Sequence, residues 1–247
     1  MPLVRNVTQL FGMRNRTVAG IILFSGAVQF NIFLLVAQAL TPGYSFVNDD
    51  ISFLGNASLS PAFLIFNTSV VVAGLALVVS GILVLRAEKS TTSAVISVLM
   101  IILGLGVAGV GVFPSGNPYG LGYNPHNEFA TVAFLFSGIA AIASYRLQKG
   151  LFSYFSVLLG VVTLVMIVPA TYRLDLGIGL AEGLRERLVL YPAFIWAILF
   201  GIYLARTSSA GVMSTQSSVA PESSYQRIES SVAIMWPPNP TAQRSTG

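Results

Sequence analysis

The sequence predicts an all-α membrane protein, a bundle of six transmembrane helices followed by a disordered C-terminal tail. Charged residues make up only 9% of the 247 residues and hydrophobic residues 54%, and the mean hydropathy is +0.77. A soluble domain needs more charge on its surface, since about a quarter of the residues in an average soluble protein are charged. The apolar residues also gather in six runs, each close to the roughly 20 residues with which a helix crosses the hydrocarbon core.

The six runs are helical by necessity, because hydrocarbon offers no hydrogen-bond partner to an unpaired peptide group. Ser60-Pro61 and Asn124-Pro125 are typical of helix starts, so we expect the second and fourth helices to begin there. The expected spans are Thr17–Leu40, Pro61–Leu85, Thr91–Phe113, Phe129–Tyr145, Leu151–Ala170 and Leu188–Ala205.

The chain therefore divides into three parts. Residues 1–16 form an N-terminal segment, residues 17–206 the six-helix transmembrane domain, and residues 207–247 the tail. The tail is rich in serine and poor in large apolar residues, a composition that favours disorder.

The distribution of lysine and arginine predicts the orientation in the membrane. Eight of these residues flank one side of the expected spans and three the other: Arg5, Arg14, Arg16, Arg86, Lys89, Arg146, Lys149 and Arg206, against Arg173, Arg185 and Arg187. The positive-inside rule places the larger set in the cytoplasm, so both termini are expected there and the protein in the cell membrane. The same scatter of short basic clusters argues against nucleic acid as a partner, despite the net charge of +4.

Polar residues gather at the outer ends of the spans, where short inner turns bring the outer loops together. Arginine there can hold phosphate or carboxylate, and histidine beside acids can move a proton. The candidate catalytic residues are Asp50, His126 and Arg187, with Arg185 to Arg187 expected in a loop before the sixth span. The full candidate substrate-binding set is Asp50, Ser52, Asn67, His126, Glu128, Arg185, Glu186 and Arg187.

Ion pairs that only fix loop packing produce the same kind of cluster, so a purely structural role for these residues stays open. His126 is the one histidine in the sequence and there is no cysteine. A lone histidine does not build the usual zinc site, so we expect no metal centre and no cofactor.

The loop motifs extend over nearly the whole transmembrane domain. The first outer loop contains Pro42-Gly43-Tyr44-Ser45 and then Asp50-Ile51-Ser52-Phe53-Leu54-Gly55. Later motifs are Phe66-Asn67, Gly111-Val112-Phe113-Pro114 with His126, Gly183 with Arg185-Glu186-Arg187, and Trp196.

Together these motifs resemble the domain-of-unknown-function 998 (DUF998) family, which implies a six-span protein, common in archaea and bacteria, without an assigned activity. The family usually has an aspartate where this chain has Phe53, so a two-acid role for the loop would need Asp49 instead. The chain is also distantly similar to the Frag/DRAM/Sfk membrane family, whose members include proteins linked to lipid remodelling.

Three functions are compatible with this pattern. The first is a bundle that binds membrane lipids or a partner subunit, as a homo- or hetero-oligomer, and it predicts a fully paired polar cluster without a cavity. The second is an intramembrane enzyme that acts on a lipid headgroup, and it predicts an outer cavity shared by Asp50, His126 and Arg187. The third is a small-solute transporter, which ranks last because no charged residue lies near the middle of a span.

Reporter fusions test the predicted orientation. A cytoplasmic reporter fused after Lys89 and another fused after Lys149 should both be active, because both lysines belong to the larger basic set. Fusions that place the two lysines on opposite sides of the membrane would contradict the six-span arrangement.

Overall fold

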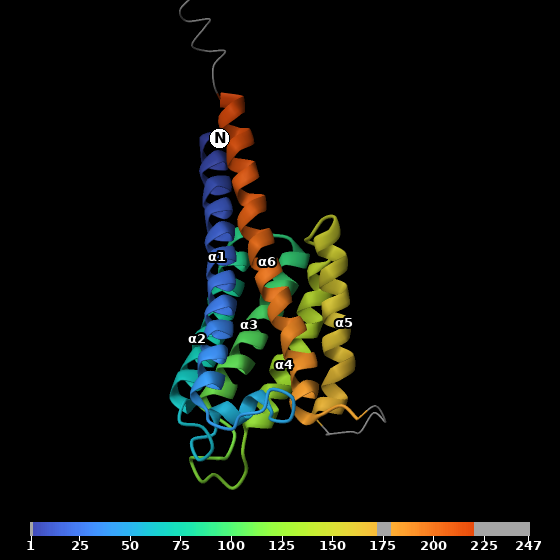
Figure 1. Ribbon diagram of the computed structural model, residues 1–247. Helices are drawn as coiled ribbons and strands as arrows, with labels where there is room; N and C mark the ends of the chain where they lie inside the picture. Colours follow the sequence, from blue (N-terminus) through green and yellow to red (C-terminus); the bar gives the residue numbers. More distant parts are fainter. Residues whose placement is uncertain (1, 172–178, 220–247) are drawn as a thin grey trace, which may run out of the picture. The chain divides into compact units, whose positions relative to one another are not determined.

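The computed structural model describes residues 2–171 and 179–219, and within them the side chains of residues 12–170 and 179–206. The described residues form long helices and one short 3-10 helix, η1, with no strand among them (Figure 1). The elements are α1 (Pro2–Leu40), η1 (Ile51–Gly55), α2 (Phe63–Ala87), α3 (Thr91–Val112), α4 (His126–Ser144), α5 (Leu151–Thr171) and α6 (Glu182–Val219).

Each of the long helices contains a segment apolar and long enough to cross a membrane. The prediction of an all-α protein with six candidate spans is therefore confirmed, and the chain is a multi-pass membrane protein. The compact unit Met1–Ser208 contains all six segments.

Several helix ends differ from the expected ones. α2 begins at Phe63, two residues late, because the Ser60 hydroxyl accepts a hydrogen bond from the Ala62 N–H at 3.2 Å and makes a turn before the helix. α1 already begins at Pro2, so the expected N-terminal segment is helical. α6 continues to Val219, and residues 220–247 of the expected tail lie outside the described residues.

Glycine lets neighbouring helices approach one another closely. A Cβ atom on Gly74 of α2 would lie 2.7 Å from the Gly104 carbonyl oxygen of α3, and one on Gly104 would lie 2.6 Å from the Gly74 oxygen. On the other side of the bundle, a Cβ on Gly201 of α6 would lie 2.8 Å from the Gly20 oxygen of α1. Van der Waals packing of small residues is a main source of helix association in lipid, so these contacts set the helix spacing.

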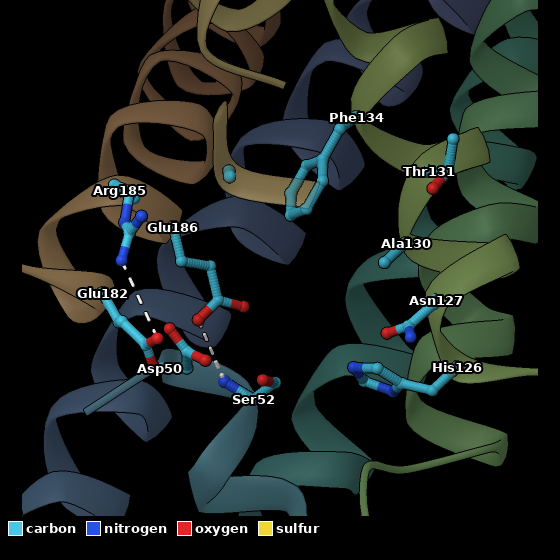
Figure 2. Close-up of a pocket in the computed structure, with 11 residues that line it drawn as sticks. Asp50, Ser52, His126, Asn127, Ala130, Thr131, Phe134, Glu182, Arg185 and Glu186 are labelled. Carbon is cyan, nitrogen blue, oxygen red and sulfur yellow. Dashed lines mark hydrogen bonds and ion pairs between the residues drawn. The ribbon is translucent and has the colours of Figure 1, made fainter. Parts of the chain in front are cut away.

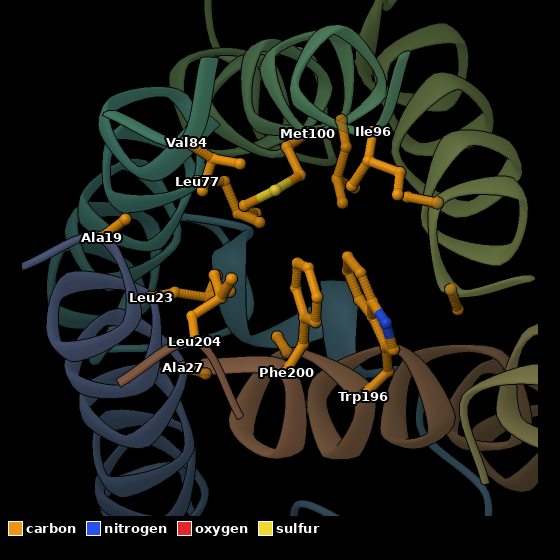
Figure 3. Close-up of a cluster of buried hydrophobic side chains, with 14 of the residues drawn as sticks. Ala19, Leu23, Ala27, Leu77, Val84, Ile96, Met100, Trp196, Phe200 and Leu204 are labelled. Atoms are coloured by element: carbon orange, nitrogen blue, oxygen red, sulfur yellow. The ribbon is translucent and has the colours of Figure 1, made fainter. Parts of the chain in front are cut away.

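Two aromatic side chains of α6 form the centre of the larger apolar core (Figure 3). Trp196 and Phe200 are fully buried and stack with ring centroids 5.5 Å apart. The indole N–H of Trp196 donates a hydrogen bond to the Ser144 hydroxyl at 3.1 Å, which satisfies its polar group inside the bundle. Side chains that pack around them include Leu23, Leu77, Val84, Ile96, Met100 and Leu204.

Arg16 connects several elements at the end of the bundle opposite η1. Its guanidinium pairs with Glu88, which follows α2, and lies 5.7 Å from the ring centroid of Tyr203 on α6. The Tyr203 hydroxyl in turn donates a hydrogen bond to the Leu147 carbonyl, in the turn between α4 and α5. This set of contacts ties together α1, α6, the turn between α2 and α3 and the turn between α4 and α5.

Substituting Gly104 with alanine should destabilise the bundle by about 1–3 kcal/mol, because the new methyl group has to displace the α2 backbone. Thermal unfolding in detergent measures the change. Gly122→Ala is the matched control, since nothing lies within 4 Å of a Cβ there, and its effect should stay within about 0.5 kcal/mol. Equal effects of the two substitutions would contradict close α2–α3 packing as the cause.

Candidate functional site

A polar cavity of about 160 Å³ lies where the outer ends of α4, α5 and α6 meet the first outer loop. Figure 2 shows two facing walls, with the side chains of α4 on one side and those of the loop and α6 on the other. The lining residues are Asp50, Ser52, His126, Asn127, Ala130, Thr131, Phe134, Ala170, Glu182, Arg185 and Glu186.

The α6 wall is helical, although we expected these residues in a loop. Glu182, Arg185 and Glu186 follow the i, i+3, i+4 spacing of one helix face, and all three line the cavity. Glu182 and Arg185 lie 3.8 Å apart as an ion pair. Gly183 and Arg187 fall on a different face, so helix geometry gives adjacent residues of the motif different surroundings.

Glu186 holds the short helix η1 in position. Its Oε2 atom accepts hydrogen bonds from the backbone N–H groups of Ile51 and, at 3.2 Å, Ser52. The residue before η1, Asp50, makes no side-chain cap of its own. A carboxylate at the N-terminus of a helix satisfies free N–H groups and favours the local dipole, so Glu186 acts as a cap supplied from α6. This contact places Asp50 and Ser52 at the cavity.

His126 forms the start of α4 and is buried, with 7% of its surface exposed. The Asn124 side chain accepts the His126 backbone N–H at 3.1 Å, as the Asn124-Pro125 motif predicts for a helix start. The ring Nδ1 lies 2.9 Å from the Phe113 carbonyl oxygen. A carbonyl oxygen only accepts, so Nδ1 is the donor in this contact.

Arg187 is 3% exposed and does not line the cavity, contrary to the expectation that it shares a pocket with Asp50 and His126. Its Nη1 donates to the carbonyl oxygens of Asp49 at 3.0 Å and Gly183 at 2.8 Å, and its Nη2 donates to the Tyr44 hydroxyl at 2.6 Å. The guanidinium also lies 4.0 Å from the centroid of the Phe46 ring. Arg187 thus holds residues 44–49 of the loop against α6.

Tyr44 completes this contact. Burial raises the pKa of its hydroxyl to about 12, against the opposite effect of the hydrogen bond from Arg187. The neutral hydroxyl accepts from Arg187 and donates to the Asp50 carbonyl oxygen at 3.4 Å. Asp49, the candidate substitute for the family's second acid, accepts the Ser45 N–H at 2.6 Å and therefore shapes the loop.

Of the remaining candidates, Asn67 lies beneath the loop and donates to the Gly55 carbonyl at 2.9 Å. Glu128 is exposed and is not part of the cavity lining. Glu182 and the α4 wall were not among the residues predicted from the sequence. The spacing of the residues could have predicted the α4 wall. Its members follow the i, i+3, i+4, i+7 pattern of one helix face: Asn127, Ala130, Thr131 and Phe134.

Two apolar cavities lie inside the bundle and share lining residues with the polar one. The first, about 60 Å³, shares Ser52, His126, Ala130, Phe134 and Glu186 with the polar cavity and adds apolar residues of α1, α2 and α3. The second, about 50 Å³, reaches the core at Trp196. Phe134 lines all three cavities, so it stands at the boundary between the polar and the apolar parts.

Comparisons with known proteins give one family. A family model described as "Protein of unknown function (DUF998)" matches residues 24–203, which is well over half of the chain. No curated protein and no solved structure matches. The distant similarity to the Frag/DRAM/Sfk family stays a prediction.

Replacing Arg187 with glutamine should release the first outer loop. The substitution removes a buried cation together with the hydrogen bonds that it donates. We expect a loss of about 2–4 kcal/mol in the free energy of unfolding. Hydrogen exchange of the amides of residues 44–50 should accelerate. Arg146→Gln, at an exposed arginine in the α4–α5 turn, is the control and should leave exchange in the loop unchanged. Unaltered exchange in Arg187→Gln would contradict the role assigned to this arginine.

Proposed function

We propose for this chain, which belongs to the DUF998 family of proteins of unknown function, that it binds a membrane lipid or a similar amphiphile at the outer end of its bundle. The headgroup would occupy the polar cavity, and one hydrocarbon chain would occupy the apolar cavities. The observation that carries the proposal is that the polar cavity and the first apolar cavity adjoin each other and share lining residues.

The polar cavity offers groups that suit a headgroup. Asp50, Glu182 and Glu186 supply carboxylate oxygens, and Arg185 supplies a cation paired with Glu182. Asn127 and Thr131 add neutral hydrogen-bonding groups on the facing wall (Figure 2). Cavities that bind small molecules typically combine a few such convergent polar groups with apolar walls.

The apolar cavities suit a hydrocarbon chain. They are lined by Phe30, Phe66, Val107, Leu190 and Phe194 among others, on α1, α2, α3 and α6. Each methylene group that leaves water for such surroundings stabilises binding by about 0.8 kcal/mol. An amphiphile with one chain in this space would gain most of its affinity there and its specificity at the headgroup.

The cavity and the position of Arg187 both bear on the choice between the expected functions. A binding bundle was expected to leave its polar cluster fully paired without a cavity; the cavity departs from that expectation and supports instead a bundle that holds its ligand inside. An enzyme was expected to use Arg187 for phosphate, but this arginine lies outside the cavity and donates to the loop instead. We therefore place amphiphile binding first.

A headgroup-processing enzyme is the second candidate, favoured by one observation. Asp50 and His126 line the same cavity, and an imidazole ring is a group able to accept a proton. In this form of the proposal His126 is the base, and Arg187 acts only through the loop that carries Asp50.

The proposed location is the cell membrane, with both termini in the cytoplasm and the polar cavity facing outward. The end of the bundle opposite the cavity carries Arg14, Arg16, Arg86, Lys89, Arg146, Lys149 and Arg206. This charge distribution supports the orientation through the positive-inside rule. Membrane lipids are then the proposed partners.

Mass spectrometry of lipid that co-purifies with the full-length protein tests the proposal. Ala130→Phe should weaken amphiphile binding by about tenfold or more, because the ring fills the junction of the polar and apolar cavities and displaces roughly two methylene groups. Glu186→Gln and His126→Ala should change which headgroup is retained. Ala57→Phe, the same substitution at an exposed loop position, is the matched control and should behave as wild type.

Two results would overturn amphiphile binding. One is wild-type protein that carries no stoichiometric amphiphile after mild solubilisation. The other is equal lipid occupancy in the Ala130→Phe and Ala57→Phe proteins. Conversion of the bound lipid by wild type, lost in His126→Ala while binding persists, would favour the enzyme over simple binding.

A further inference from the structure

We infer that a second lipid site, selective for phospholipids with an anionic headgroup, lies on the side of α4 and α5 that faces away from the rest of the bundle. It is a groove at the end of the bundle opposite the polar cavity, and it does not depend on that cavity binding anything. The site is formed by the last turns of α4, the turn of residues 145–150 and the first half of α5.

The groove is open and about 710 Å³ in volume. Its walls are Ile142, Tyr145, Tyr154, Val157, Leu158 and Val161. The rings of Tyr145 and Tyr154 meet edge to face at its end, with centroids 6.2 Å apart. From Tyr154 to Val161 the α5 wall rises about 10 Å at 1.5 Å per residue, so the groove follows the direction of an acyl chain.

The packing of α4 against α5 explains why a groove forms here. A Cβ on Gly160 would lie 2.6 Å from the Gly138 carbonyl oxygen, so the two helix backbones touch at these glycines. Gly150, with φ of 65°, makes the tight turn that returns the chain alongside α4. Small residues at the line of contact leave no side chain to fill the surface beside it, and the larger side chains on either side become the walls.

Charge at the end of the groove selects the headgroup. Arg146 lines the groove and is exposed, and Lys149 is exposed three residues later in the same turn. Within the described part of the chain, the carboxylate at this end of the bundle is Glu88, which pairs with Arg16. The N-terminus of α5, which begins five residues after Arg146, adds a partial positive charge. A lipid phosphate that carries a further negative or neutral polar group fits these positively charged surroundings.

The position of α5 argues for lipid as the occupant. α5 stands at the edge of the bundle beside α4 (Figure 1), and its span is 22% buried against 33–44% for the other five. Leu158 and Val161, two of its aliphatic side chains that line the groove, are exposed. A second copy of the chain packed symmetrically on this groove would bring Arg146 and Lys149 of one copy close to the same two residues of the other copy. These cations would repel one another. A phospholipid of the inner leaflet supplies both the chain and the opposite charge.

Native mass spectrometry of the delipidated full-length protein tests this site. Phosphatidylglycerol and phosphatidylcholine with identical acyl chains are titrated in detergent, and the wild type should retain phosphatidylglycerol preferentially. The double variant Arg146→Gln, Lys149→Gln should lose about 30-fold of its phosphatidylglycerol affinity, because each cation near an anionic lipid contributes about 1 kcal/mol. Arg86→Gln, Lys89→Gln is the matched control, since it removes two cations from the other inner turn, away from the groove.

A second variant separates the groove from general surface charge. Leu158→Trp should fill the groove and weaken both phospholipids without changing any charge, while Ala130→Phe should leave phosphatidylglycerol binding here intact. Equal affinity of the wild type for the two phospholipids would overturn the site. So would equal losses in the two double variants, or a protein dimer that Leu158→Trp dissociates.

Discussion

The structure depends on one constraint, that hydrocarbon cannot satisfy a peptide group or a polar side chain. It makes every span a helix, and it leaves van der Waals contact as the main force that joins the helices. The glycine contacts between Gly74 and Gly104 and between Gly20 and Gly201 follow from it, because only bare backbones approach so closely. The buried Trp196 indole meets the constraint with an internal partner, the Ser144 hydroxyl.

The polar and charged residues at the two ends of the bundle make different kinds of contact. At the inner end Arg16, Glu88 and Tyr203 connect helices and turns, and further exposed cations such as Lys89, Arg146 and Lys149 lie at the same end. At the outer end, adjacent residues of α6 hold one loop from two sides: Glu186 binds the N–H groups of η1, and Arg187 binds the preceding turn. The outer loop is thereby a fixed wall, and the cavity between it and α4 has a defined set of polar groups.

The two proposed lipid sites differ in the same physical terms. Three of the charged groups that line the polar cavity are carboxylates, and an apolar cavity adjoins it inside the bundle. The α4–α5 groove has cations at one end and aliphatic walls that face the bilayer. A molecule retained inside the bundle would be selected by headgroup contacts, whereas one on the outer surface would be selected by charge at the membrane boundary and would exchange with bulk lipid.

The sequence by itself determined the spans and the regions where polar residues gather, because hydropathy and charge position are local properties that the bilayer reads directly. It also identified Asp50, Ser52, His126, Arg185 and Glu186, five residues that line the cavity. Only the tertiary structure decided that Arg187 lies outside it, that Glu186 caps η1, and that Phe134 and Glu182 belong to it. The reason is that α6 begins at Glu182 as a helix, so adjacent residues point in directions about 100° apart, and which direction meets the loop depends on how α6 packs against α1 and α4.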